Sequence, residues 1–292
     1  MCPRCGAALV ESQAALSCSS CPYRAEQAEG ILFFDRGIAA ERQDHDALYK
    51  YETAHPWFTH RLNVIRRAFA KHVGTNEDVL EVGAGTGHTA RALVADGYGS
   101  LSLGDIHRNG LLYAKQYGLT KLYQFDLSSP PFRDHFDVVA LFDVLEHLPD
   151  DELAVRNIRA MLRPGGRILL TVPAHRWLWG PVDVISSHRR RYERKGLNSL
   201  LVSGGFEVLE CRYFFTAMVP GLLLRSLLSR DLSLENVARK SGLELSRLGN
   251  VVLTLASGPG DVLLSPLRNV TGGSLLAVAR KSREPRRAGN AA

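Results

Sequence analysis

The stretch VLEVGAGTG, residues 79–87, has the residue types and spacing that hold a small ligand against the main chain. Three glycines follow a short apolar run, and such loops let a ligand approach the backbone closely. A dinucleotide loop needs its third glycine three places after the second, where this chain has His88. A Walker A loop needs Gly-Lys followed by Ser or Thr, which is missing. Glu81 stands two residues before the first glycine, and its carboxylate favours a cationic ligand over a pyrophosphate.

Two further acids follow at the ends of later apolar runs. Asp105 comes 18 residues after Gly87, where a carboxylate can accept both hydroxyls of a ribose. Asp126 stands in QFDL, where an acid can accept the amino group of an adenine. Ile106 and Leu127 are placed to sandwich the adenine ring. Together with Glu81, these residues favour S-adenosylmethionine (SAM), which carries an ammonium, a sulfonium, a ribose and an adenine.

The elements that must position these residues are short apolar runs alternating with helical patterns. This alternation predicts repeated βαβ units, hence a parallel sheet covered by helices. Ligands of such sheets bind at the carboxyl ends of the strands. The predicted strands are residues 78–83, 101–106, 121–126, 136–143 and 166–173, with later strands at 205–215 and 273–282.

The motifs occur in the order found in one enzyme family. The E-x-G-x-G-x-G loop, an acid after the second strand, D-L after the third, FDVV...LEHL at the fourth and LRPGG before the fifth resemble class I SAM-dependent methyltransferases. The resemblance covers about residues 76–210. It implies an α/β fold with a Rossmann-like seven-stranded sheet, helices on both faces and SAM as cofactor. The cofactor contacts that it implies are Glu81, Gly83, Ala84, Gly85, Gly87, Asp105, Ile106, Asp126, Leu127, Phe142 and Asp143.

Two flanking segments resemble a bacterial subgroup of that family, the methyltransferase type 11/12-like proteins. Residues 52–61 match its E..H.WF..R helix, which lies over the SAM pocket in that subgroup, and residues 172–192 match its VPA...WLW...D....H.RRY segment. Members often occur among enzymes that modify glycans, lipids or secondary metabolites, so this resemblance indicates the cofactor better than the substrate. The segments supply the substrate candidates, which are Trp57, Trp177, Trp179, Asp183, Arg190 and Arg191.

Methyl transfer needs a base only when the acceptor starts protonated, as a hydroxyl does. The catalytic candidates at the expected sheet edge are His147, His175, His188 and Tyr192. Asp143-x2-Glu146-His147 resembles the E-x-x-E-H run of ubiquinone-pathway O-methyltransferases, which binds a divalent cation, although Asp replaces the first Glu here. Two readings therefore stay open for this run, a divalent cation site and a set of side chains that orient the helix start and the pocket.

Two other segments also leave alternatives open. The basic run HRRRYERK, residues 188–195, is either an anion clamp for a phosphate or carboxylate of the substrate or a solvated helix start. The Leu-rich segment 221–228 lies in an expected helical lid insertion, about residues 216–262. It is either a lid or substrate wall or a membrane-surface helix.

Four cysteines lie in the first 21 residues as two C-x2-C pairs. Their spacing predicts a zinc ribbon with a tetrahedral four-thiolate site, and two disulfides are the alternative. The expected zinc ligands are Cys2, Cys5, Cys18 and Cys21. Cys211 stands alone in an apolar strand pattern and is expected to be a buried small side chain.

Length and composition bound the rest. The 292 residues are 45% hydrophobic and 23% charged, typical of a globular protein. The net charge of +6 would suit nucleic acid, but the tail 280–292 holds +4 of it. The opening MCPRCG has no apolar signal core, so we expect a cytoplasmic enzyme. The expected organisation is a zinc ribbon (1–34), a helical cap or linker (35–75), a methyltransferase domain (76–282) and a disordered basic tail (283–292).

Three functions fit these observations. The first is methyl transfer to a small molecule, most simply to an oxygen of a natural product, sugar or lipid-linked intermediate. The second is RNA base methylation, because the ribbon resembles that of rRNA guanine methyltransferases. Against it, the ribbon has few basic residues (Arg4 and Arg24), and no N-P-P-Y or D-P-P-Y motif occurs. The third is a non-catalytic SAM-binding module whose ribbon docks a protein partner.

Overall fold

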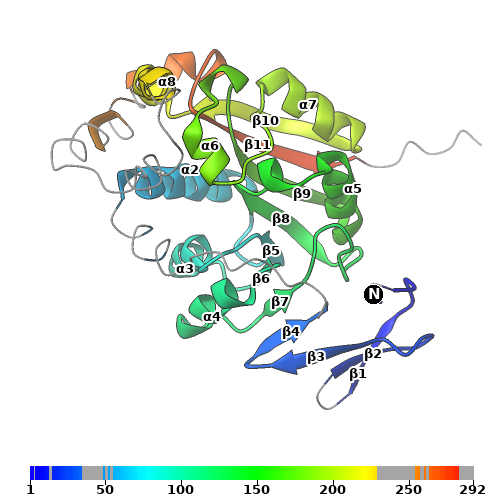
Figure 1. Cartoon of the computed structure of the whole chain (residues 1–292). Coiled ribbons are helices and arrows are strands. Elements are labelled where there is room, and N and C mark those ends of the chain that lie inside the picture. The colour runs from blue at the N-terminus through cyan, green and yellow to red at the C-terminus, as the bar shows by residue number, and fades with distance from the viewer. Residues whose placement is uncertain are drawn as a thin grey trace, which may run out of the picture.

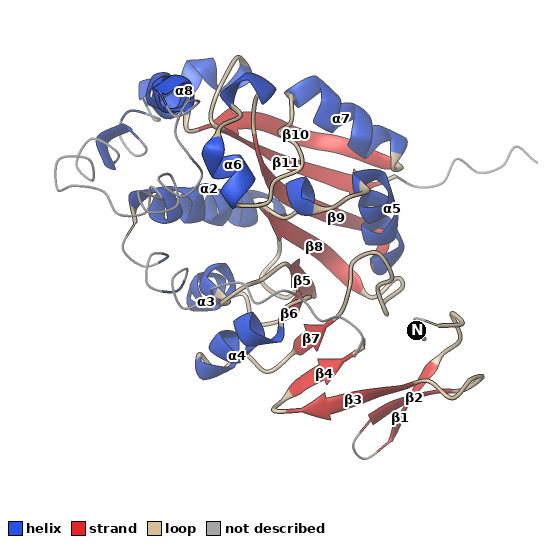
Figure 2. Cartoon of the chain, viewed as in Figure 1, coloured by secondary structure: helices blue, strands red, loops and turns tan. Residues whose placement is uncertain are grey.

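The computed structural model describes residues 1–2, 4–12, 15–34, 49, 52, 55–228, 254–256, 260 and 263–282. Within these residues one mixed sheet of 11 strands runs through the molecule, with helices on both faces (Figures 1 and 2). The strand order is β1-β2-β3-β4-β7-β6-β5-β8-β9-β11-β10. The α/β class predicted from the alternating pattern is thereby confirmed.

The seven predicted strands all form and make up the larger part of the sheet. β7, β6, β5, β8 and β9 are parallel neighbours, whereas β11 pairs antiparallel with both β9 and β10. β5 is the middle strand of the five parallel ones, so the glycine loop that follows it opens at the middle of their carboxyl edge. The bounds are β5 (Val79–Val82), β6 (Leu101–Asp105), β7 (Leu122–Gln124), β8 (Phe136–Phe142), β9 (Leu162–Pro173), β10 (Phe206–Phe214) and β11 (Ser274–Lys281).

The core lies in two layers, one on each face of the sheet, because successive strand residues point to opposite faces. On β8, Val139 and Leu141 pack on one side, whereas Val138 and Ala140 pack on the other. The first layer includes buried residues of α5 (Asp151–Met161) and α7 (Arg194–Ser203), and the second includes those of α2 (Pro56–His72), α3 (His88–Ala95) and α4 (Arg108–Gln116).

The N-terminal ribbon, residues 1–34, extends this sheet. Its strands β1 (Leu9–Ser12), β2 (Ala15–Cys18), β3 (Arg24–Ala28) and β4 (Ile31–Phe33) pair antiparallel in chain order. β4 then pairs parallel with β7, so the ribbon lies beside the β7 edge (Figure 1). The seven-stranded sheet expected from the sequence is thus part of a wider one. The expected boundaries at residues 34, 75 and 282 stay predictions.

Short elements connect the carboxyl ends of the strands. They are η1 (Leu145–His147), η2 (Arg176–Leu178), α6 (Pro181–Ile185), η3 (Thr216–Met218), α8 (Val219–Leu228) and η5 (Ser265–Asn269). η3 and α8 begin the expected lid insertion, most of which lies outside the described residues, as does the tail 283–292. Within the expected helical cap or linker (35–75), α2 begins at Pro56, with His55 as its N-cap. None of the helices among the described residues has the length and apolar character needed to span a membrane.

Candidate active site

The glycine loop connects β5 to α3 and requires glycine for two physical reasons. Gly83 and Gly87 adopt φ values of 69° and 77°, a region that other residues rarely occupy. A Cβ at Gly83 would lie 2.3 Å from Cγ2 of Val144, and one at Gly87 would lie 2.8 Å from Cβ of Ala114. The loop therefore lies tightly against the end of β8 and against α4.

Glu81 is the last but one residue of β5 and is buried in the centre of the sheet, with 4% of its surface exposed. Its Oε2 atom has no hydrogen-bond partner among the described residues. Burial raises the pKa of Glu81 to about 8, and the neighbouring Glu52 and Asp105 charges act in the same direction. A buried, unsatisfied carboxylate at a glycine loop fits a ligand that brings a positive charge, as the ammonium of SAM would.

Asp105 ends β6 and is also buried. Its Oδ2 accepts a hydrogen bond from Gly85 N at 2.8 Å and its Oδ1 accepts one from His107 N at 2.7 Å. Each oxygen keeps a second lone pair for a ribose hydroxyl. The carboxylate therefore fixes the glycine loop as well as offering the predicted ribose contact, a positioning role that the spacing did not reveal.

The predicted adenine contacts lie after β6 and β7. Asp126 accepts a hydrogen bond from Ser128 N at 2.7 Å, which shapes the turn after β7. Leu127 is buried, and Ile106 is half-buried with its carbonyl bound by Gln124 Nε2 at 3.0 Å. The strands and turns bring these three residues to the edge that also carries Asp105.

Asp143 follows β8 with a positive φ of 57°, in a backbone conformation that is strained for a non-glycine residue. Its carboxylate is paired with Arg61 of α2 and accepts a hydrogen bond from Thr171 Oγ1 at 3.1 Å. Arg61 also donates to the carbonyl of Phe142 at 2.8 Å. Glu52 accepts a hydrogen bond from Thr86 of the glycine loop. The E..H.WF..R segment thus contacts the loop and the end of β8, where Ala84 and Phe142 are buried.

Asp183 and His188 form a hydrogen-bonded pair beside this edge. His188 Nδ1 lies 2.8 Å from Asp183 Oδ1, and Asp183 also accepts from Arg191 Nε at 2.8 Å and Gly180 N at 2.8 Å. Burial alone would raise the pKa of Asp183, but the hydrogen bonds from His188 and Arg191 lower it overall. An ionised Asp183 holds the His188 proton on Nδ1, which leaves a lone pair on Nε2.

Nε2 of His188 points toward a cluster formed with Glu146 and His147. It lies 3.9 Å from Glu146 Oε1, and the His147 and His188 ring centroids are 4.9 Å apart. Glu146 is fully buried, and neither of its carboxylate oxygens has a hydrogen-bond partner among the described residues. Burial, followed by the charge of Asp143, raises the pKa of Glu146 well above its usual range.

One ligand atom from each of Glu146, His147 and His188 lies within 4.8 Å of the other two. This grouping differs from the Asp143, Glu146 and His147 set considered from the sequence, because Asp143 is paired with Arg61 instead. Burial and the charge of His188 lower the pKa of His147, which favours its neutral form.

The two other catalytic candidates, His175 and Tyr192, use their polar atoms in hydrogen bonds to neighbouring side chains. His175 uses both ring nitrogens, with Nδ1 2.9 Å from Glu193 Oε2 and Nε2 3.1 Å from Thr271 Oγ1. Tyr192 is buried and donates to Asp151 Oδ2 at 2.9 Å, and burial raises the pKa of its phenol further. These contacts favour a positioning role for both residues.

The aromatic substrate candidates occupy different places. Trp57 stacks on Phe215 at a centroid distance of 5.8 Å, with the Arg61 guanidinium 5.3 Å from its ring. Trp177 is 45% exposed and stacks on His175 at 4.9 Å. Trp179 instead lines a cavity of about 580 Å³, which we name the arginine pocket; its other lining residues are Arg176, Arg189, Arg190 and Arg191. The sequence pattern identified Arg190 and Arg191 but missed Arg176, which lies outside the basic run.

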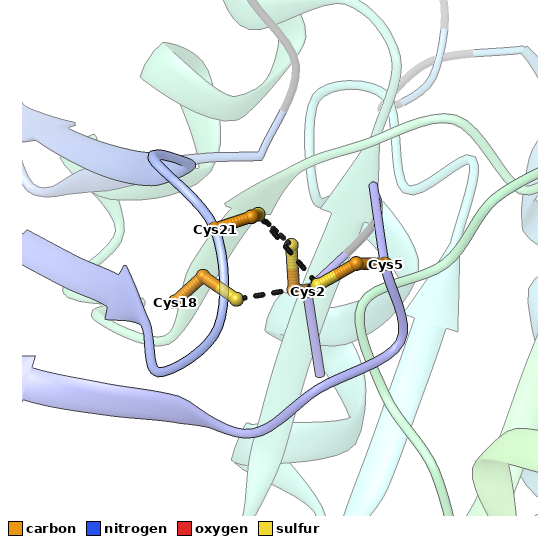
Figure 3. A group of neighbouring side chains, drawn as sticks. All are labelled: Cys2, Cys5, Cys18 and Cys21. Carbon is orange, nitrogen blue, oxygen red and sulfur yellow. Dashed lines mark hydrogen bonds between the residues drawn. The ribbon is translucent and has the colours of Figure 1, made fainter.

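The four N-terminal cysteines point toward one another from two turns of the ribbon (Figure 3). The Sγ atoms of Cys2 and Cys21, and of Cys5 and Cys21, are 3.6 Å apart, and those of Cys5 and Cys18 are 3.4 Å apart. Four sulfurs at about 2.3 Å from a tetrahedral Zn²⁺ would lie about 3.8 Å from one another. Ser20 N donates to Cys18 Sγ at 3.3 Å, and this hydrogen bond lowers the pKa of the thiol to about 6. All four cysteines are free, so the geometry favours a metal over the disulfide alternative.

Comparisons with known proteins agree with this architecture. A family model described as a methyltransferase domain matches residues 57–211. The ubiquinone biosynthesis O-methyltransferase of Escherichia coli O9:H4 (strain HS) is 28% identical over 177 residues, which cover 54% of this chain and 73% of that protein. The protein of the same name from Escherichia coli O157:H7 is 29% identical over 147 residues, covering 44% of this chain and 61% of its own length.

Solved structures share the fold at low identity. One is a complex between the Haloferax volcanii Trm112 methyltransferase activator and a candidate methyltransferase. It matches with a TM-score of 0.55 and 19% identity over 84% of this chain and 100% of the other. Another is phosphoethanolamine N-methyltransferase 2 of Haemonchus contortus in complex with SAM. It matches with a TM-score of 0.54 and 18% identity over 86% of this chain and 62% of the other.

The five parallel strands β5 to β9, the glycine loop after β5 and the buried acids Glu81 and Asp105 all lie in the segment that the family model matches. The chain belongs to the methyltransferase-domain family and is a SAM-dependent methyltransferase of class I fold.

Proposed function

We propose that this methyltransferase transfers the methyl group of SAM to an oxygen of a small-molecule acceptor, with His188 as the general base. The observation that carries this proposal is the Asp183–His188 pair, whose geometry leaves Nε2 free to accept a proton. A hydroxyl acceptor needs such a base, whereas an acceptor that already carries a lone pair does not. The two Escherichia coli relatives named above, which are O-methyltransferases, support the same acceptor atom.

SAM, when bound, supplies a methyl group on a positively charged sulfur. The residues of this chain would bind and orient it: Glu81 would hold the ammonium, Asp105 the ribose and Asp126 the adenine, with Ile106 and Leu127 on either side of the ring. Gly83, Ala84, Gly85 and Gly87 would offer their backbone to the cofactor, and a Cβ at Gly83 or Gly87 would clash with Val144 or Ala114. Arg61 holds Asp143 and the Phe142 carbonyl in place. Because the sulfonium is already activated, alignment of the acceptor supplies much of the rate.

Proton removal follows from the hydrogen bonds of His188. Asp183 accepts the proton on Nδ1 and so fixes the tautomer and the ring orientation. When Nε2 takes the acceptor proton, the ionised Asp183 stabilises the imidazolium, and Arg191 keeps Asp183 in position. General-base catalysis of this kind contributes roughly 10²–10⁴-fold to a rate.

A divalent cation is a second candidate for the same cluster. Glu146, His147 and His188 would be its ligands, since a buried carboxylate without partners and a histidine oriented by a carboxylate are typical of metal sites. The cation would orient the acceptor oxygen and lower the pKa of its hydroxyl. Deprotonation of that hydroxyl would then no longer depend on His188 as a base. Activity of desalted protein that rises with added Mg²⁺ or Mn²⁺, and does not rise in Glu146→Gln, would favour the cation.

The four cysteines are proposed to bind a structural zinc ion. Their sulfur separations fit a closed four-thiolate site, which has no open position for chemistry. The zinc therefore serves the ribbon and the sheet edge that the ribbon covers.

The first experiment is methyl transfer from tritiated SAM into a host extract that is then separated into RNA, protein and solvent-extractable fractions. We expect the label in the small-molecule or lipid fraction, and label in RNA would overturn the acceptor class. With the labelled acceptor in hand, His188→Ala should lower kcat by about 10²-fold or more. Added imidazole should restore part of this loss, which a purely structural defect would not allow.

The matched control is His72→Gln. His72 lies at the carboxyl end of α2, paired with Glu210 at 2.8 Å and remote from the cluster, so this variant should keep wild-type kcat. Asp183→Asn should lower kcat while leaving the affinity for S-adenosylhomocysteine (SAH) unchanged. A His188→Ala enzyme with undiminished kcat would exclude the base.

A further inference from the structure

We propose that the acceptor carries a phosphoryl group, as a phosphate monoester or a diphosphate, and that the arginine pocket binds this group. This inference rests on the proposed function in one respect, which is that the ligand of the pocket is the small molecule that receives the methyl group. Arg176, Arg189, Arg190 and Arg191, together with Trp179, line this pocket, which has a volume of about 580 Å³ and is partly open to solvent. Cavities of this size hold whole small molecules rather than a lone ion.

Two of the four guanidinium groups are already neutralised. Arg190 is paired with Asp151 at 2.8 Å and donates to the carbonyls of Leu148 and Pro149. Arg191 is paired with Asp183 at 2.8 Å and donates to the carbonyl of Ala174. These two residues build the wall of the pocket and cannot account for an excess of positive charge.

The other two arginines carry that excess. Arg176 and Arg189 have no acidic partner among the residues that the structure describes. Arg189 is held by its own backbone and Nε, which donate to the carbonyls of Glu146 at 2.9 Å and His147 at 3.0 Å. Its terminal nitrogens remain for a ligand. Arg176 begins η2, three residues after the last residue of β9, and is exposed.

The positive charges of Arg176 and Arg189 favour some anions over others. A carboxylate would balance one of the two arginines and leave the other. A phosphate ester carries about −1.5 to −2 at neutral pH and presents several acceptor oxygens to the planar guanidinium forks. A phosphoryl group therefore balances both charges and matches their donor geometry.

The pocket lies on the acceptor side of the active site. Arg189 is bonded to the backbone of Glu146 and His147, and Arg191 shares Asp183 with His188. A phosphoryl group anchored in the pocket would therefore lie next to the residues that hold His188, and the half-buried Trp179 lines the same pocket.

Calorimetric titration of the full chain at low ionic strength tests this inference without any methyl transfer. The probes are phenyl phosphate, geranyl diphosphate and benzoate. We expect phenyl phosphate or geranyl diphosphate to bind at least tenfold more tightly than benzoate. The tighter of the two identifies the source as a soluble phosphate ester or as a lipid-linked diphosphate. Equal binding of benzoate, or no binding of either phosphorylated probe, would overturn the proposal.

Arg176→Gln and Arg189→Gln should each weaken the tighter probe by about tenfold or more and leave SAH binding unchanged. Arg156→Gln, an exposed arginine of α5 paired only with Glu152 at 3.5 Å in the described chain, is the matched control and should bind the probe as the wild type does. An equal loss in all three variants would mean non-specific charge attraction and would refute the site. Methyl label in the RNA fraction, or an undiminished kcat in His188→Ala, would instead count against the proposed function, so the two failures are distinguishable.

Discussion

Glu81 couples the binding of a cation to the pH of the solution. The carboxyl group is buried without a partner for Oε2, and its pKa lies near 8 rather than at its ordinary value of 4.5. At neutral pH the ligand-free protein therefore holds a proton there, which a positively charged ligand must displace.

We expect the affinity for SAH to rise between pH 6 and pH 8, by up to about tenfold per pH unit, because only ionised Glu81 attracts the ammonium. The unfolding free energy of the ligand-free protein should change in the opposite direction. The raised pKa means that the folded state holds the extra proton, so this stabilisation is complete below pH 4.5 and is lost as pH rises toward 8.

Calorimetry at pH 6, 7 and 8 measures the binding slope. Glu81→Gln should bind SAH weakly and with little pH dependence. Glu207→Gln, an exposed acid paired with Arg280, should keep the wild-type slope. If SAH affinity depends on pH in Glu81→Gln as it does in the wild type, the titration of another group controls binding.

Site residues that local spacing defines could be predicted from the sequence, whereas side-chain contacts between distant residues could not. The glycine loop, Glu81, Asp105 and Asp126 follow from spacing, because each stands at a strand end. The Arg61–Asp143 pair joins residues 82 positions apart, and no periodicity encodes it. The Asp183–His188 pair depends on the turn between α6 and the following segment, where Ser187 has a positive φ of 56°. For that reason, the sequence alone could not tell which of His175, His188 and Tyr192 acts as the base.

At the scale of elements, β4 does more than complete the ribbon. It pairs with β7, places Phe34 N 2.9 Å from the carbonyl of Gln124 and buries Ile31 completely in the same core layer as α4. β7 leads directly to Asp126, so the ribbon supports the strand that presents the expected adenine contact. Alternation of apolar runs predicted the seven strands of the domain, since each run has its own pattern. It could not predict that β4 pairs with a strand about 90 residues later.

Ile31→Ala should lower the free energy of unfolding by about 2–5 kcal/mol, because it leaves a cavity between β4 and α4. Chemical denaturation monitored by circular dichroism measures this change. Val202→Ala, at a side chain 59% exposed on α7, is the control and should change stability by less than about 0.5 kcal/mol. Similar values for both variants would mean that β4 is only loosely docked.

At the scale of the whole molecule, the ribbon and the methyltransferase sheet share hydrogen bonds and a core, so they should unfold together. On heating, zinc release detected with a chromogenic chelator should coincide with the loss of far-ultraviolet circular dichroism. We expect the two events to coincide because β4 cannot separate from β7 without exposing Ile31 and Phe34 to water. Zinc release at a clearly lower temperature would show that the ribbon is an independent unit.

Two variants test the same coupling at constant temperature. Cys18→Ser should remove the zinc and lower the melting temperature of the entire chain. Cys211→Ser replaces a thiol of β10 far from the cluster in the sheet order, and its zinc content should equal that of the wild type.

The pairing of β4 with β7 also bears on association between molecules. Without the ribbon, β7 would be an edge strand with free N–H and C=O groups, and such strands recruit strands from other chains. The ribbon covers that edge and moves the boundary of the sheet to β1, a strand of four residues. Metal-depleted protein, with β4 detached, would present the bare edge of β7 beside its cofactor loops. Loss of zinc would then lead to aggregation through the sheet, at the strand that carries Asp126 at its end.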